Sequence, residues 1–199
     1  MTTLRPASEV IDATVIDRAP DRERDFAPFV AGVEASPRDQ GTLHAIVRRP
    51  ERDRREVVNE ATLDLETGLV GDDWLARGSS SQPDGRANPD SQLTIMSVRV
   101  LGAIEPDESR WPLAGDQLLV DLDLSNEALP AGARIRVGEA ELVISETPHT
   151  GCAKFSGRFG SDAQRWINSP LGRGLRLRGV NARVVRGGIV RVGDIIQTV

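Results

Sequence analysis

The residues of this chain with the clearest capacity for chemistry lie between Glu146 and Phe159. This segment contains Cys152, the single cysteine among 199 residues, together with His149, one of two histidines, and Lys154. A thiol reacts as its thiolate, and neighbouring cations favour that form by lowering a pKa that is normally near ~8.5. We therefore interpret His149 and Lys154 as candidate activators of a nucleophilic Cys152.

Plainer interpretations of the same residues compete with this one. A lone cysteine in an intracellular protein is often a small buried hydrophobic residue, and a loop histidine often has no chemical role. Against these, Gly151 precedes the cysteine and the segment follows an apolar strand directly, a position at which loops often carry function. The residues alone leave both interpretations of Cys152 open.

Composition excludes several classes of protein. The formal net charge is -5 and the sequence pI is about 5.2, so the general electrostatic footprint of a nucleic-acid-binding protein is missing. One cysteine rules out an intrachain disulfide and a zinc site built from several thiolates, and we expect no zinc. No apolar run approaches the ~18 residues of a membrane span, and the first 15 residues lack a signal-peptide pattern. We predict a cytoplasmic protein that does not enter the membrane.

The chain divides into an N-terminal extension, residues 1–40, and one domain, residues 41–199. Within the extension, 17–25 and 35–40 are rich in charge or turn-forming residues and are typical of linkers. The apolar residues that could dock the extension on the domain are Val10, Ile11, Val15, Ile16, Phe26, Phe29 and Val33. A variable extension and a dimer arm both fit this pattern, and the oligomeric state stays open.

The domain is predicted to be mainly β. Short apolar or alternating runs, separated by turn-forming residues, indicate strands over 42–48, 56–65, 92–96, 118–122, 133–137, 141–145, 180–185 and 189–196, the last one broken at Gly193. Antiparallel chains of this kind hide their strand edges by closing, so the sequence favours a closed or nearly closed β-barrel.

Only a few short helices are expected beside these strands. Ser97 is a good N-cap for a helix that presents Val100 and Ile104 on one face. Ser161 and Gln164 match a capping box at the start of a second helix, which Pro170 should end.

Two other loop features are candidates for a ligand site. Asp72 follows a tight glycine-rich turn and can accept backbone hydrogen bonds, and Trp74 could line a cleft or cover the barrel end. Residues 76–91 form a long polar loop, which makes them a candidate lid.

Arginines gather near the C-terminus of the domain. Arg176 and Arg178 stand two apart in a predicted strand, so both should point to one face and could bind a small anionic ligand. A solvated edge strand kept from aggregating by charge is an equally good interpretation.

The order of several short motifs resembles that of MOSC domains, named for the C-terminal domain of molybdenum-cofactor sulfurase. The motifs are Gly68-Leu69-Val70-Gly71-Asp72, Gln92-Leu93-Thr94-Ile95, Gly115-Asp116-Gln117-Leu118, the run 132–138 leading to Cys152, the run 178–184, and Val192-Gly193-Asp194. Pro148 and His149 close to Cys152, Lys154 and Phe155 look most like the small stand-alone bacterial members. The resemblance covers residues 41–199.

The resemblance implies a β-barrel with a cleft in which Cys152 either carries sulfur as a persulfide or is the protein's ligand to molybdenum. A polarizable thiolate suits both molybdenum and sulfane sulfur. By this resemblance the molybdenum cofactor (molybdopterin) would be bound by Asp72, Trp74, Thr150, Arg176, Arg178, Asn181 and Arg183, the arginines serving its phosphate. Two positions depart from the family pattern: Gly115-Asp116-Gln117 stands for Gly-Glu-Asn, and Trp74 stands where histidine is common.

Two functions therefore remain. The first is a molybdenum-cofactor-binding or sulfur-carrier protein, in one form the molybdenum-binding component of a reductase of N-hydroxylated compounds. It would need an electron-transfer protein or a cysteine desulfurase as partner. The second, motivated by the two departures, is a non-catalytic binding or regulatory module in which Cys152 is buried and unreactive.

Overall fold

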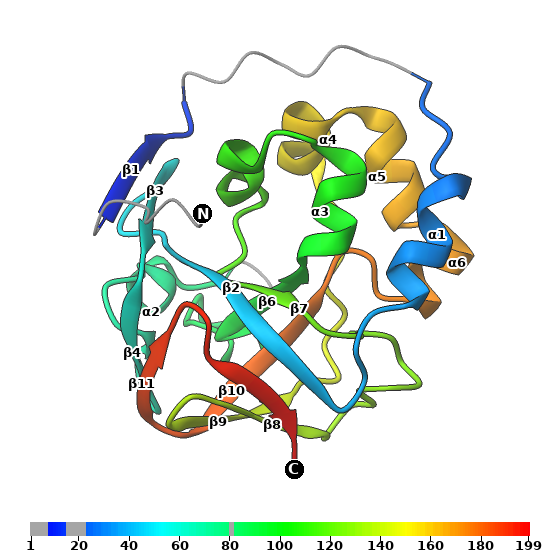
Figure 1. The fold of residues 1–199 in the computed structure, drawn as a ribbon. Helices are drawn as coiled ribbons and strands as arrows, with labels where there is room; N and C mark the ends of the chain where they lie inside the picture. The colour runs from blue at the N-terminus through cyan, green and yellow to red at the C-terminus, as the bar shows by residue number, and fades with distance from the viewer. Residues whose placement is uncertain (1–7, 15–22, 80–81) are drawn as a thin grey trace.

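The computed structural model describes residues 8–14, 23–79 and 82–199. Seven strands form a closed ring, and short helices gather on one side of it (Figure 1). In ring order the strands are β2 (Gln40–Arg48), β12 (Ile195–Thr198), β8 (Arg134–Val137), β9 (Ala140–Ile144), β10 (Val180–Arg186), β6 (Leu93–Ser97) and β7 (Leu118–Asp121). The predicted mainly β fold with a closed barrel is confirmed.

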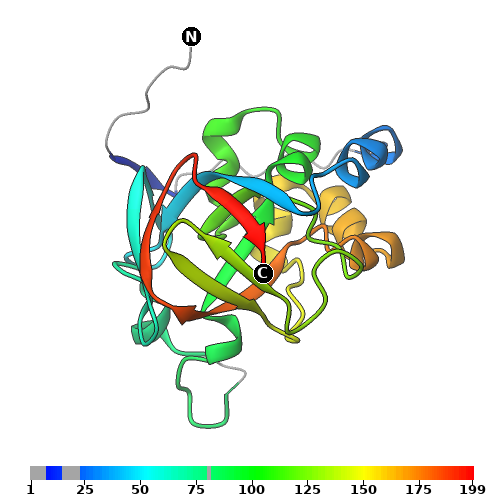
Figure 2. The same cartoon turned by 60° about the horizontal axis from the view of Figure 1, so that its bottom comes forward.

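Strand β2 closes the ring because it pairs on both edges. Thr42 pairs with Ile195 of β12, and Leu43 pairs with Val120 of β7, both in antiparallel register. The other ring pairings are also antiparallel, except for β6 and β7, which run parallel. Figure 2 shows the strands curving around a common interior.

Two apolar clusters stabilise this arrangement. Leu, Ile and Val side chains such as Leu43, Leu93 and Leu142 fill the barrel interior and are fully buried. A second cluster joins the outer face of the barrel, at residues such as Met96, to the helices, where Phe155 and Phe159 are buried. The second cluster fixes the helices that follow the cysteine segment against the barrel wall.

The predicted strand 56–65 is in fact two strands. The chain turns at Asn59, so that β3 (Arg54–Val58) extends the main sheet while β4 (Glu60–Asp64) enters a separate sheet with β11 (Gly188–Arg191) and β5 (Gly68–Leu69). Pairing of Ala61 with Val190 fixes β4 there. Local alternation could not show this, because it does not reveal which partner each half pairs with.

The described parts of the extension pack on the domain. Strand β1 (Ser8–Asp12) pairs antiparallel with β3, and α1 (Ala27–Glu34) contacts α3 (Val98–Ile104). Arg24 donates to both carboxylate oxygens of Asp162, at 2.8 and 3.0 Å. Val15, Ile16 and most of the predicted linker 17–25 lie outside the described residues.

The predicted helix boundaries agree with the structure only in part. Ser97 caps α3 as expected, its hydroxyl accepting from the Arg99 amide. The capping box at Ser161 is wrong: Ser161 is already the first residue of α5 (Ser161–Ile167), and the N-cap position is Gly160, which has no side chain that could cap the helix. Pro170 does not merely end α5; it begins a further helix, α6 (Pro170–Gly174).

The remaining short helices are α2 (Trp74–Arg77), η1 (Pro89–Ser91), η2 (Glu108–Ala114) and α4 (Ala153–Phe159), of which α4 directly follows Cys152. Across the described ranges, no helix has the length and apolar character needed to cross a membrane.

Candidate functional site

Two adjoining hollows flank the segment that leads to Cys152. The helix-side hollow, of about 510 Å³, lies toward α5 and α6, and the α2-side hollow, of about 610 Å³, lies toward α2 and η1. Both are lined by Thr147, Pro148, His149, Thr150 and Asn181. We refer to the two hollows together as the groove.

Asn181 of β10 positions this segment. Its side chain is buried and donates from Nδ2 to the Thr147 carbonyl at 3.0 Å, while its own carbonyl accepts from the Ser145 amide at 2.9 Å. The chain leaving β9 is therefore attached to β10 for several residues beyond the strand, which brings His149 and Thr150 over the centre of the groove.

Gly151 fixes the last step before the cysteine. Its amide donates to Asn168 Oδ1 at 3.1 Å, and its carbonyl accepts from Gln164 Nε2 and Asn168 Nδ2, each at 3.3 Å. A Cβ added at Gly151 would lie 2.7 Å from Ile167 Cδ1, closer than real contacts allow. The backbone just before Cys152 is thus held against the end of α5, and Cys152, two residues beyond the groove-lining Thr150, is exposed.

A buried polar group lies beneath His149. Asp116, whose side chain has no exposed surface, accepts from Arg178 Nη1 at 2.6 Å, and its other oxygen lies 3.5 Å from His149 Nδ1. Arg178 also donates to the Ala114 carbonyl at 3.0 Å, and its guanidinium lies 5.0 Å from the Phe155 ring centre. These contacts hold Arg178 inside the protein.

Burial shifts the protonation equilibria of this group. Burial lowers the pKa of His149 well below its ordinary 6.5, and the positive charges of Arg178 and Arg49 lower it further. Burial raises the pKa of Asp116, although Arg178 opposes this shift. His149 is therefore a neutral imidazole at neutral pH.

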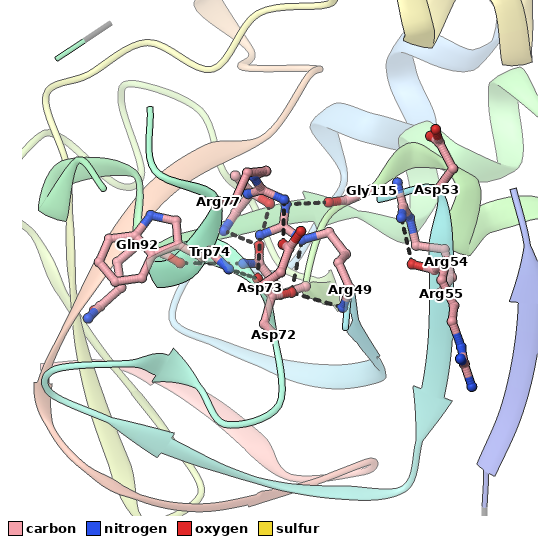
Figure 3. A network of polar contacts seen from close by, with 12 residues as sticks. Arg49, Asp53, Arg54, Arg55, Asp72, Asp73, Trp74, Arg77, Gln92 and Gly115 are labelled. Atoms are coloured by element: carbon pink, nitrogen blue, oxygen red, sulfur yellow. Dashed lines mark hydrogen bonds and ion pairs between the residues drawn. The ribbon is translucent and has the colours of Figure 1, made fainter. Parts of the chain in front are cut away.

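Asp72 has a structural role at the end of the α2-side hollow (Figure 3). Its fully buried carboxylate accepts from Arg49 Nε and Nη2, each at 2.9 Å, and from the amides of Arg49 and Trp74. Trp74 is itself buried and lines the hollow. Asp72 thereby fixes Arg49 and the start of α2, and it does not line the groove.

Three arginines bind three successive carbonyl groups behind the groove. Arg158 donates to Leu113, Arg178 to Ala114 and Arg49 to Gly115, at 2.8, 3.0 and 3.0 Å. The segment that carries Asp116 is therefore held from three sides, in a region where cationic side chains are concentrated.

Arg173 and Arg176 bring positive charge to the helix-side hollow. Arg173 donates through Nε to the Asn168 carbonyl at 3.0 Å, and Arg176 donates through Nη1 to the Leu129 carbonyl. Neither arginine forms an ion pair with any of the described residues. Partial burial without such a counter-ion lowers the pKa of Arg176.

The prediction that Arg176 and Arg178 share one face of a strand is wrong. Strand β10 begins only at Val180, and Arg176 has a left-handed backbone with φ 47. The turn sends the two side chains apart, Arg178 inward to Asp116 and Arg176 to Leu129. Arg183 lies on β10 but is exposed and lines neither hollow.

The comparisons with known proteins agree with this architecture. The family model of the MOSC domain matches residues 86–197. The chain belongs to the MOSC domain family. No curated protein sequence matches it significantly.

Solved structures show the same fold. YuaD of Bacillus subtilis is 18% identical with a TM-score of 0.54, covering 80% of this chain and 95% of its own. YiiM of Escherichia coli is 22% identical with a TM-score of 0.52, covering 79% and 69%. YiiM of Geobacillus stearothermophilus is 15% identical with a TM-score of 0.55, covering 80% and 75%.

In this MOSC domain, two of the three predicted catalytic residues contact carboxylates. Lys154 Nζ binds Asp53 Oδ1 at 3.1 Å, and Arg158 binds the same oxygen at 3.2 Å. The Nδ1 atom of His149 faces Asp116. Their role as activators of Cys152 stays a prediction, and each has a different neighbour from the one that the sequence suggested.

Sequence reasoning missed several groove residues. The sequence motifs do not assign Asp116, which lies beneath the groove, or Arg49, Arg77 and Arg173, which line it, to the site. Of these, Arg49 and Arg77 line the α2-side hollow. A buried acid after a glycine was a usable signal for Asp116, whereas nothing local distinguishes these arginines from other surface arginines.

The donor set of the groove fits a phosphate-bearing cofactor. MOSC domains are associated with the molybdenum cofactor. The groove offers the guanidinium groups of Arg173 and Arg176, the Thr150 hydroxyl and the exposed edge of the His149 ring, whose buried Nδ1 atom faces Asp116. Cys152 is exposed and follows Thr150 by two residues. In the described part of the chain, no three His, Cys, Asp or Glu side chains cluster as a metal site.

Proposed function

We propose that this MOSC domain binds the molybdenum cofactor in the groove and uses Cys152 as its reactive thiol. The observation that carries the proposal is an exposed cysteine two residues beyond Thr150, which lines a groove where Arg173 and Arg176 have no carboxylate partner among the described residues. A phosphate or similar anion is the ligand that such guanidinium groups recognise best.

Different residues of this chain would bind different parts of the cofactor. Arg173 and Arg176 would hold the phosphate, and Thr150 and Asn181 would contact the polar edges of the bound molecule. Trp74 and Arg77 would enclose the part that extends into the α2-side hollow. When bound, the cofactor would supply the redox-active metal, for which a soft thiolate is a suitable ligand.

Two reactions fit a thiol in this place. In the first, the protein is the molybdenum-binding component of a reductase of N-hydroxylated compounds and receives electrons from an electron-transfer protein. In the second, Cys152 carries sulfur as a persulfide that a cysteine desulfurase supplies. The exposure of Cys152 favours either reaction, because each needs the sulfur to be reached by a second molecule.

The test is cofactor and sulfur analysis of protein purified without air from a host that makes the molybdenum cofactor. We expect stoichiometric molybdenum and pterin, or a sulfane-sulfur mass increment, in the wild type and neither in Cys152→Ser. A double variant, Arg173→Gln with Arg176→Gln, should lose the cofactor while keeping the thiol. The matched control is Arg183→Gln, an exposed arginine outside the groove. Wild-type protein that carries neither cofactor nor persulfide refutes the proposal.

The second candidate function is a non-catalytic binding module. It requires a buried and unreactive Cys152, whereas Cys152 is exposed to solvent in the structure. Alkylation of the folded protein measures whether the Cys152 thiol is reactive. Failure of iodoacetamide to modify Cys152 under native conditions would favour the non-catalytic module.

A further inference from the structure

Two buried polar atoms at the base of the groove face each other, and the Thr94 side chain also lies close enough to Asp116 to favour its ionised form. Among the described residues, Asp116 Oδ1 and His149 Nδ1 are both inaccessible to solvent and have no hydrogen bond that meets ordinary geometry. They lie 3.5 Å apart, slightly beyond a normal hydrogen bond. Buried polar atoms are rarely left unpaired, so this pair needs an explanation.

Asp116 cannot turn away from the histidine to find water. Its side chain has no exposed surface, and its second oxygen is held by Arg178 at 2.6 Å. Arg178 is itself fixed by the Ala114 carbonyl and by the Phe155 ring. The free oxygen of Asp116 therefore keeps its direction toward His149.

The imidazole has one buried edge and one edge toward the groove. Its Nδ1 atom faces Asp116, whereas the ring lines both hollows and its side chain is 16% exposed. The two nitrogens of an imidazole point in widely different directions, so Nε2 faces the groove. A proton on Nδ1 satisfies the carboxylate oxygen, and the other nitrogen of the neutral ring is then an acceptor.

We propose that Asp116 is a positioning residue that holds His149 with its proton on Nδ1, so that Nε2 accepts a hydrogen bond from an N–H or O–H group of an anionic ligand in the groove. The preferred ligand has its negative charge near Arg173 and Arg176 and a hydrogen-bond donor beside His149. This proposal rests on the groove being the ligand site proposed above. It does not require that ligand to be the molybdenum cofactor.

Charges around the ring favour the neutral form. The charged groups that face the imidazole are Arg178 and Arg49 on the positive side and Asp116 on the negative side. Because Arg178 already balances the charge of Asp116, a second proton on His149 would add an uncompensated charge to a buried region. The ring therefore serves as an acceptor and not as a fixed cation.

The tautomer can be measured directly by long-range nitrogen–proton correlation NMR of labelled protein. The chain has two histidines, so His44→Gln leaves the His149 signals alone in the spectrum. We expect the Nδ1-protonated tautomer in the wild type and loss of this preference in Asp116→Asn, with circular dichroism confirming that the variant folds. An Nε2-protonated ring in the wild type overturns the assignment without any variant.

The ligand preference is tested with two small anions that differ in one donor, hydroxymethylphosphonate and methylphosphonate. We expect the hydroxyl compound to bind the wild type about fivefold more tightly, the size of one net hydrogen bond, and His149→Phe to bind both equally. Equal affinity of the wild type for the two compounds, or binding of neither, overturns the ligand preference. A protein with the Nδ1 tautomer and donor preference but without cofactor or persulfide would refute only the proposed function.

Discussion

Replacing Asp162 by asparagine should release the extension from the helices that follow Cys152. The carboxylate accepts from Arg24 at 2.8 and 3.0 Å and from the Ala163 amide at 2.8 Å. Arg24 in turn donates to the carbonyls of Ile104 and Phe159, the last residues of α3 and α4. Arg24 and Asp162 thus connect the N-terminal extension to the end of α3 and to the region where α4 ends and α5 begins.

The size of the effect follows from the pKa of the carboxyl group. Hydrogen bonding from Arg24 and the backbone lowers the pKa of Asp162 from 3.8 to about 2. Each unit corresponds to about 1.4 kcal/mol, so ionised Asp162 contributes about 2 kcal/mol to the free energy of unfolding. Because the folded-state pKa is the lower one, this contribution is complete above the unfolded pKa of about 4, and about half is lost by pH 3.

Urea unfolding of the wild type and Asp162→Asn between pH 7 and pH 3 measures this contribution. We expect the midpoint to fall by an amount equivalent to about 2 kcal/mol at pH 7 with an unchanged slope, and the difference to shrink toward pH 3. Glu60→Gln is the control, because Glu60 and Arg191 form an exposed pair that should contribute less than about 1 kcal/mol. A difference that stays constant with pH would refute the reasoning.

Three further predictions concern the site and its support. Lys154→Met should leave the rate of Cys152 alkylation within about twofold of the wild type, since Lys154 binds Asp53, and a large decrease measured by mass spectrometry would restore it as an activator. Because the pKa of His149 is lowered in the folded protein, the free energy of unfolding should fall as the pH drops below ~6.5, by up to about 1.4 kcal/mol per pH unit. Urea unfolding of His149→Gln at several pH values should lack this part of the acid sensitivity. Gly179→Ala should lower the free energy of unfolding by about 3 kcal/mol or more, because its Cβ would lie 2.1 Å from the Ile95 carbonyl oxygen at φ 92; near-wild-type thermal stability would contradict this.

Local patterns predicted the elements whose formation depends mainly on neighbours in sequence. The alternation of apolar residues located β2, β7 and β10, and the Gly138 turn located the hairpin of β8 and β9. Ser97 marked the start of α3. The helix α4 was missed because Ser156 and Gly157 are weak helix formers, and the helix is stabilised by burial of Phe155 and Phe159.

The sequence by itself determined the closed β-barrel, the MOSC resemblance and the loop that carries the single cysteine, because periodicity, turn residues and motif order are local properties. Only the tertiary structure decided which charged groups meet. Asp53 and Lys154 are 101 positions apart, and Asp116 and Arg178 are 62 apart. An ion pair forms where folding brings opposite charges together, and spacing along the chain does not show which charges will meet. The assignment of His149 to Asp116, and of Arg176 and Arg178 to different directions, therefore had to come from the fold.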